Sequence, residues 1–333
     1  MMRLIQVIHP GHGRRIGLIT GEDEVSLLGG YRTAYEAALA ALDNGQPLRE
    51  LLGSLPVQGV LSYDAICSGG GHGRIFLPFD HPSEPARCLV SGTGLTHNAS
   101  AETRQKMHSA GEHETDSMRM YRWGVEGGRP AAGEIGTAPE WFYKGSGLIL
   151  RAYGDSLEVP AFAEDGGEEP EIAGIYVIDH SGTPRRIGMA IGNEFSDHKT
   201  ERRNYLYLAP SKLRQCSIGP ELIIDPDFTR VMGRVAIERG GETIWSKEIG
   251  SGEERMSHSL ANIEHHHFKY PQHRRPGDVH VHFYGADAFS FGAGIELQNG
   301  DVMSVAFEGF GRPLRNHIHL SEKAETLVTV KPA

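Results

Sequence analysis

The chain has 333 residues and carries 33 Lys and Arg against 43 Asp and Glu, a formal net charge of −10. An acidic surface repels phosphate backbones, and no run approaches the roughly 18 apolar residues of a membrane helix, so neither nucleic acid nor a membrane is an expected partner. The N-terminal segment has no apolar signal core and the three cysteines form no close pair, which together predict a cytoplasmic protein with reduced thiols.

The first part of the sequence predicts a small α/β module. Residues 2–8 and 14–20 are short runs typical of strands. Residues 31–44 carry apolar side chains at helical spacing and end before a glycine, a favoured helix stop. A second short helix is expected over residues 47–52.

A proline-rich segment, residues 77–88, is typical of a connector between domains. We therefore expect a small N-terminal domain of residues 1–85 and a catalytic domain of residues 86–333. The second domain opens with a predicted strand over 88–95 and a short predicted helix over 101–109.

Beyond Leu148 the predicted elements are strands separated by turns, and helices are scarce. The strand-like segments cover residues 148–154, 172–179, 185–192, 221–225, 234–241, 242–249, 278–285, 294–301, 301–309 and 325–331. Strands at such spacing indicate an α+β, β-dominated fold, a barrel, roll or sandwich, rather than a doubly wound sheet.

The sharpest chemical pattern is acidic. Glu169 and Glu171 flank a proline just before a strand-like run, and residues i and i+2 of an extended chain point to the same side. Glu194 follows the next strand. Three converging carboxylates need a counter-charge, which a hard divalent cation supplies. The alternative is a solvated acidic loop, and the spacing by itself favours that alternative.

Two lysines occupy positions from which they could reach a pocket. Lys212 lies between a loop and an apolar strand, and a desolvated lysine there could act as a base or orient an anionic substrate. Lys144 follows three aromatic residues. The alternatives are a surface lysine for Lys212 and, for Lys144, a stem that covers the aromatic rings while its head reaches water.

The histidines offer a weaker metal hypothesis. His280 and His282 flank a valine on a predicted strand and so share a face, as imidazole ligands do in β-barrel metal sites. Residues 265–267 are three consecutive histidines, which cannot all face one metal. Ordinary structural histidines are the expected alternative.

Read in order, these motifs resemble the fumarylacetoacetate hydrolase superfamily over residues 86–320. The motifs that carry the resemblance are Lys144 after aromatic residues 141–143, Glu169-Pro170-Glu171, Gly192-Asn193-Glu194, Lys212, Gly219-Pro220, and residues 300–302, 308–311 and 314–316. The resemblance implies a catalytic domain built as a mixed β-roll, a smaller N-terminal domain and a homodimer.

The resemblance also implies roles for individual residues. Its metal ligands map onto Glu169, Glu171 and Glu194, the last being a glutamate where the superfamily has an aspartate. Its two lysines map onto Lys144 and Lys212, which are then expected to bind substrate, with Lys212 also catalytic. The implied cofactor is Mg²⁺ or Mn²⁺, which accept similar oxygen ligands.

Two departures from the hydrolase pattern favour a different reaction. Residues 94–102 lack the histidine–glutamate pair that activates water in the hydrolases, although Glu102 remains a candidate general acid. The hydrolase turn Gly-Thr-Pro is here Gly285, Ala286 and Asp287, which are expected to contact substrate. Residues 265–285 resemble the sugar-acid dehydratases of the superfamily.

The resemblance therefore implies dehydration of a 2-keto-3-deoxy-pentonate, a small 2-keto acid, to 2,5-dioxopentanoate in pentose catabolism. Lys212 would transfer the C3 proton or stabilise the enolate, and a neutral Lys212 would need a lowered pKa. One alternative is a hydrolase of a 2,4-diketo acid, with His108 and Glu112 replacing the missing pair. The other is an inactive sugar-acid-binding protein.

Overall fold

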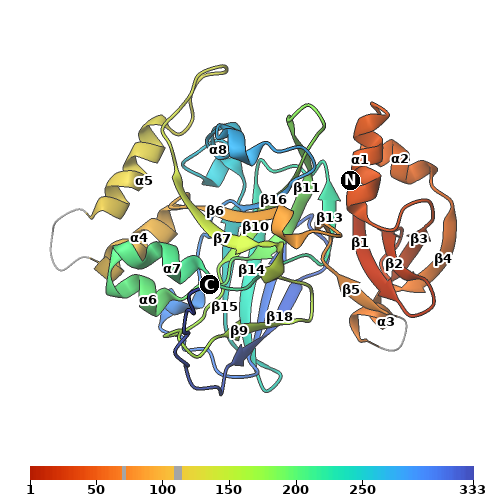
Figure 1. The fold of residues 1–333 in the computed structure, drawn as a ribbon. Helices are drawn as coiled ribbons and strands as arrows, with labels where there is room; N and C mark the ends of the chain where they lie inside the picture. Colours follow the sequence, from red (N-terminus) through yellow and green to blue (C-terminus); the bar gives the residue numbers. More distant parts are fainter. Residues whose placement is uncertain (70–72, 109–114) are drawn as a thin grey trace.

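The computed structural model describes residues 1–69, 73–108 and 115–333, and for residues 106–108 it describes the backbone alone. Two sheets dominate it, one of 13 strands and one of five, with short helices at their margins (Figure 1). The predicted α+β, β-dominated fold class is confirmed. None of the described helices is long and apolar enough to cross a membrane.

The helices and strands have the following bounds. The helices are α1 (Ala34–Asp43), α2 (Leu48–Ser54), α3 (Tyr63–Cys67), α4 (Asn98–His108), α5 (Asp116–Gly127), α6 (His198–Arg203), α7 (Leu208–Lys212) and α8 (Leu260–Phe268). The strands are β1 (Met2–His9), β2 (Gly13–Ile19), β3 (Glu24–Leu28), β4 (Val57–Ser62), β5 (Arg74–Phe76), β6 (Cys88–Gly94), β7 (Glu140–Ser146), β8 (Leu150–Arg151), β9 (Ser156–Val159), β10 (Pro170–Ile178), β11 (Pro184–Asn193), β12 (Cys216–Ile218), β13 (Leu222–Ile224), β14 (Val231–Arg239), β15 (Glu242–Ser251), β16 (Val279–Phe283), β17 (Val302–Phe307) and β18 (Leu314–Leu320).

The N-terminal elements form a group at one end of the molecule (Figure 1). Helix α1 begins with a reciprocal cap, in which Thr33 Oγ1 accepts a hydrogen bond from Glu36 N and the Glu36 side chain accepts one from Thr33 N. Strand β1 pairs with β2 and also with β13, where Leu4 is opposite Leu222. The large sheet is thus continuous across the predicted domain boundary, and that boundary stays a prediction.

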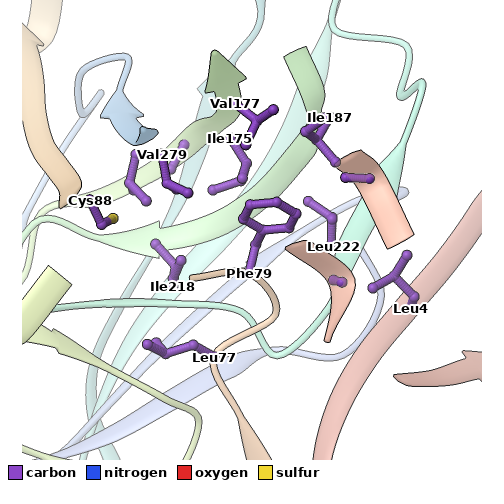
Figure 2. Close-up of a cluster of buried hydrophobic side chains, with 14 of the residues drawn as sticks. Leu4, Leu77, Phe79, Cys88, Ile175, Val177, Ile187, Ile218, Leu222 and Val279 are labelled. Atoms are coloured by element: carbon purple, nitrogen blue, oxygen red, sulfur yellow. The ribbon is translucent and has the colours of Figure 1, made fainter. Parts of the chain in front are cut away.

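The main hydrophobic core lies between α1 and the large sheet. It joins Leu4 and Phe79 to Leu222 and Val279 from much later in the chain (Figure 2). The face of α1 that points into this core is made of alanines, which lets the helix approach the strands closely. Burial of these apolar side chains holds the N-terminal elements against the later part of the chain.

The opposite face of the β10–β16 pair carries a buried polar layer beneath α8. Trp141 Nε1 donates to His267 Nδ1 over 3.1 Å, and because an indole only donates, the proton of neutral His267 sits on Nε2. That Nε2 then donates to His280 Nδ1 over 2.9 Å. His282 lies between the hydroxyls of Ser91 and Thr93. These histidines form hydrogen bonds within the layer, as the non-metal alternative predicts.

Some elements differ from the sequence expectations. Residues 294–301 and 325–331, both predicted as strands, have no regular structure. The first loops around Asp301, whose carboxylate accepts from Gln298 N, and the second is exposed and pairs with no described strand. Helices α5 and α8 were not predicted from the sequence.

The buried histidines predict an acid-sensitive fold. Burial lowers the pKa of His280 and of His282 to about 3, against about 6.5 in an unfolded chain. Their neutral forms stabilise the fold above pH 6.5, and this contribution falls as pH drops towards 3, by about 1.4 kcal/mol per pH unit for each histidine. We expect H282Q to lose less unfolding free energy than wild type between pH 7 and 4.5, in urea titrations.

Exposed His319 supplies the matched control, because H319Q removes a histidine that is already in water. An identical pH slope in wild type, H282Q and H319Q would contradict the role assigned to His282.

Candidate metal centre and active site

The β10–β11 hairpin brings the three predicted glutamates together. The antiparallel register sets Pro170 opposite Asn193 and Glu171 opposite Gly192, so the start of β10 lies beside the end of β11. Glu194 N donates to Glu169 O over 2.9 Å and continues this pairing. One carboxylate oxygen from each of Glu169, Glu171 and Glu194 lies within 4.8 Å of the others. All three side chains are buried, so the solvated-loop alternative is wrong.

Two buried lysines neutralise part of this charge. Lys212, the last residue of α7, donates to Glu169 Oε1 over 2.5 Å and to Glu194 Oε2 over 2.7 Å. Lys144 on β7 forms an ion pair with Glu194 and donates to Phe195 O over 2.9 Å. Both side chains are about 1% exposed, so the alternatives of a surface lysine and of a head group in water are wrong.

The pKa shifts show how the charge is distributed. Burial would raise the pKa of Glu169, but Lys212 and His198 hold it well below its usual value. Burial raises the pKa of Glu171 well above its usual value, and Glu194 and Glu169 raise it further. Burial also disfavours the ammonium of Lys212, yet Glu169 and Glu194 raise its pKa. Lys212 is therefore a protonated cation here, and the lowered pKa that a neutral base requires is not found.

The donor set fits a hard divalent cation. Oxygen ligands from carboxylates are those that Mg²⁺, Mn²⁺ and Ca²⁺ take in proteins. The pKa of Glu171 is raised by burial and by the neighbouring Glu194 and Glu169, which shows that the two lysines do not fully balance the negative charge of the cluster. Glu169, Glu171 and Glu194 are the residues that would hold such an ion.

A cavity opens directly above the carboxylates. Its lining residues are Gly94, Leu95, Ser100, Arg104, Phe142, Glu169, Glu171, His198, Glu201, Lys212, Gly285, Ala286 and Phe289. Sequence reasoning missed three charged or titratable members of this lining, Arg104, His198 and Glu201. They come from α4 and α6, which lie together over the site (Figure 1). The polar run 198–203 directly after Glu194 is the only sequence signal that pointed towards two of them.

Each of these three side chains contacts another of the three or a carboxylate of the metal cluster. His198 Nε2 lies 3.1 Å from Glu169 Oε1, and its ring stacks on Phe289 at a centroid distance of 4.7 Å. Arg104 forms an ion pair with Glu201, in which Nε lies 2.8 Å from Oε1. Through Nη1 it also donates to both carboxylate oxygens of Glu140. The site is thus enclosed by fixed charges.

The predicted substrate-binding turn is divided between two roles. Gly285 and Ala286 line the cavity, and Gly285 N donates to Glu171 Oε2 over 2.6 Å. Gly285 has φ +102°, and a Cβ there would lie 1.9 Å from Thr96 Oγ1, so only glycine fits. Asp287 turns away from the cavity and accepts from Gly250 N over 2.9 Å. Its substrate contact stays a prediction.

Glu102, the acid–base candidate on α4 whose side chain the structure describes, does not lie at the carboxylates. Glu102 is exposed and accepts a hydrogen bond from Asn98 over 2.8 Å, outside the cavity lining. Its catalytic role stays a prediction. The side chain of His108 and the whole of Glu112 lie outside the described residues.

Comparisons with known proteins place this geometry in context. No family model matches the chain. A curated protein named probable 2-keto-3-deoxyxylonate dehydratase, from Haloferax volcanii, is 27% identical over 178 residues. That match covers 52% of this chain, and the chain spans only 58% of the length of that relative.

Solved structures match over nearly the whole chain. A 2-keto-3-deoxyarabinonate dehydratase superposes with a TM-score of 0.72 at 20% identity, covering 97% of this chain and all of the other. A 2-keto-3-deoxy-D-arabinonate dehydratase complexed with magnesium and 2,5-dioxopentanoate gives 0.71 at 19% identity, with the same coverage of both chains. A 2-hydroxyhepta-2,4-diene-1,7-dioate isomerase from Mycobacterium marinum gives 0.60 at 15% identity, again covering 97% of this chain and all of the other.

This likeness establishes the fold. The chain has the same fold as these dehydratases and this isomerase, in line with the fold that the resemblance implied. Within that fold, the chain is similar to 2-keto-3-deoxy-pentonate dehydratases in both sequence and structure.

Removing one glutamate should separate metal binding from folding. We expect Mg²⁺ or Mn²⁺ to raise the melting temperature of wild type, since a ligand at 100 times its Kd stabilises a fold by about 2.7 kcal/mol. E171Q should lose most of that rise. Without metal, E171Q should melt above wild type, because it removes a carboxyl group whose ionisation is opposed by burial and by two neighbouring carboxylates.

The measurement is thermal unfolding with metal and with EDTA, and E254Q, at an exposed position, is the control. A metal-induced rise in E171Q equal to that in wild type would exclude Glu171 as a ligand.

Proposed function

We propose that this chain is a metal-dependent hydro-lyase that converts a 2-keto-3-deoxy-pentonate, of the arabinonate or xylonate type, to 2,5-dioxopentanoate. The observation that carries the proposal is the buried cluster of Glu169, Glu171 and Glu194 beneath a small cavity. Support comes from the solved relative of the same fold that is complexed with magnesium and 2,5-dioxopentanoate, and from the curated dehydratase relative.

The charge of the site suits a 2-keto acid. Three carboxylates against the two ammonium groups of Lys144 and Lys212 leave one net negative charge when all are ionised. A divalent cation, for which we propose Mg²⁺, reverses this to one net positive charge. A single positive charge complements the one carboxylate of a 2-keto acid.

The chain's own residues prepare the site for loss of the C3 proton. When bound, the cation would supply Lewis-acid stabilisation of negative charge that develops on the keto oxygen. Lys212 adds a fixed positive charge beside the cluster, and Phe142 covers it with its ring centroid 4.8 Å from Nζ. Lys144 holds Glu194 in place. Charges held in a site of low water content act strongly on charge that forms during reaction.

This arrangement revises the role considered for Lys212. Of the two roles expected from the sequence, electrostatic stabilisation is the one that a protonated ammonium performs, and Glu169 and Glu194 raise the pKa of Lys212 in the metal-free site. We propose that a carboxylate or imidazole lining the cavity accepts the C3 proton.

The alternatives are less well supported. A hydrolase needs a base, such as a histidine, that activates a water. His198 is the one histidine among the described lining residues, and its Nε2 already lies within hydrogen-bond distance of Glu169. An inactive binding protein would have no need for two buried lysines and three buried carboxylates, which are expensive to bury unless they are paired.

Location and assembly are also proposals. The thiols of Cys88 and Cys216 are buried and unbridged, which supports the reducing cytoplasm. A homodimer is implied by the resemblance, and light scattering on the purified protein measures it directly.

A turnover assay tests the proposed reaction. We expect wild type with Mg²⁺ to remove the mass of one water molecule from either the D or the L form of 2-keto-3-deoxypentonate, with the product identified by mass spectrometry. EDTA should abolish the reaction, because the carboxylates alone cannot stabilise new negative charge.

Inactivity on both forms, with cleavage of a 2,4-diketo acid, would put the hydrolase first. Metal-dependent stabilisation without any product would instead favour the binding protein.

A further inference from the structure

Glu201 is a buried carboxylate on the cavity wall that neither the metal cluster nor the sequence motifs account for. It lies in α6 and is 3% exposed. It lines the same cavity as Glu169, Glu171 and Lys212. Its Oε1 forms an ion pair with Arg104, 2.8 Å from Nε, while its Oε2 accepts no hydrogen bond from the described part of the chain. Glu201 therefore presents one uncommitted carboxylate oxygen.

The other ionisable groups of the described lining contact the metal cluster or are cations, and the one free ring nitrogen, His198 Nδ1, lies against Gly167. Glu169 and Glu171 belong to the metal cluster. Lys212 donates to two of the cluster carboxylates, and His198 Nε2 lies 3.1 Å from Glu169. Arg104 is a cation that cannot act as a base. Glu201 is thus the one lining carboxylate outside the metal cluster.

On the basis of the proposed function, we propose that Glu201 is the catalytic base, taking a proton from C3 and passing it to the departing C4 hydroxyl. The C3–H bond breaks and its electron pair forms the C3–C4 double bond as the C4–O bond breaks. The hydroxide leaves with the proton from Glu201, giving one water molecule and restoring the carboxylate. The product of this step is the enone 5-hydroxy-2-oxopent-3-enoate. Loss of a proton from C5 and gain of a proton at C3 then isomerise it to 2,5-dioxopentanoate, so the atoms balance and no oxidant or reductant is needed.

Arg104 is the positioning residue for this base. Its guanidinium lies between Glu140 and Glu201 and is bonded to both. Holding Oε1 of Glu201 fixes the plane of the carboxylate and leaves Oε2 for the substrate. Because α4 carries Arg104 and α6 carries Glu201, packing of these two helices sets the position of the base.

Proton transfer can be followed apart from dehydration with 2-oxopentanoate, which has acidic C3 hydrogens and no C4 hydroxyl to lose. Wild type with Mg²⁺ in D₂O should incorporate deuterium at C3, measured by NMR. E201Q should lose about 10³-fold in this exchange rate and in dehydration. E201D should recover part of both, because it restores a carboxylate.

The matched control is E238Q, which removes a carboxylate that pairs with an arginine, Arg315, outside the cavity lining. It should retain the exchange. An equal loss in E238Q and E201Q would overturn the proposal, since the effect would then not depend on a carboxylate in the cavity. Exchange in E201Q at the wild-type rate would overturn it directly.

Two readouts separate this inference from the proposed function. The metal-induced rise in melting temperature should be unchanged in E201Q, because its three cluster glutamates are intact. If wild type exchanges C3 hydrogens and dehydrates neither pentonate, the proposed function fails while Glu201 stands as a base. If wild type dehydrates and E201Q does so equally well, Glu201 fails while the function stands.

Discussion

The structure is organised around the need to neutralise three carboxylates buried within 4.8 Å of one another. An isolated buried charge is costly, and a set of like charges is more so, unless cations stand beside it. The fold supplies two of these cations from elements distant in sequence, Lys144 from β7 and Lys212 from the end of α7. The raised pKa of Glu171 shows that this compensation is incomplete. The negative charge that the two lysines leave uncompensated is what suits the cluster to a divalent cation.

In the large sheet, the two faces of the strands carry packing interactions, and the candidate active site lies at the ends of the strands. Around β10 and β16, one face packs into the main hydrophobic core, and the other carries the histidine layer under α8. The chemistry lies at the end of these strands, where the β10–β11 hairpin and Gly285 meet. The strands therefore fix the ligands while the edge of the sheet stays open to a cavity. Short helices α4 and α6 complete that cavity from above.

Sequence reasoning reached the parts of the site that depend on local geometry. The period of two in a strand predicted that Glu169 and Glu171 converge, and motif order added Glu194 and the lysines. Arg104 and Glu201 were missed because neither sits in a motif and their meeting depends on the packing of α4 against α6. The strand predicted over 294–301 failed for a similar reason, since its turn is fixed by Asp301 and not by its apolar pattern.

Glu194, at a position where the resemblance implies an aspartate, still brings its carboxylate to the cluster. Its carboxylate still lies within the 4.8 Å group, and each oxygen faces a lysine, Oε1 towards Lys144 and Oε2 towards Lys212. The ammonium of Lys212 thus stands between Glu169 and Glu194, where it supplies the positive charge that a divalent cation would bring. The two cations repel each other, so a bound metal would weaken at least one of the contacts of Lys212. On the proposed function, a lysine loosened in this way would have its charge available to the carboxylate or keto oxygen of the substrate. Lys212 would then act in both states, neutralising the buried carboxylates without metal and the substrate with it.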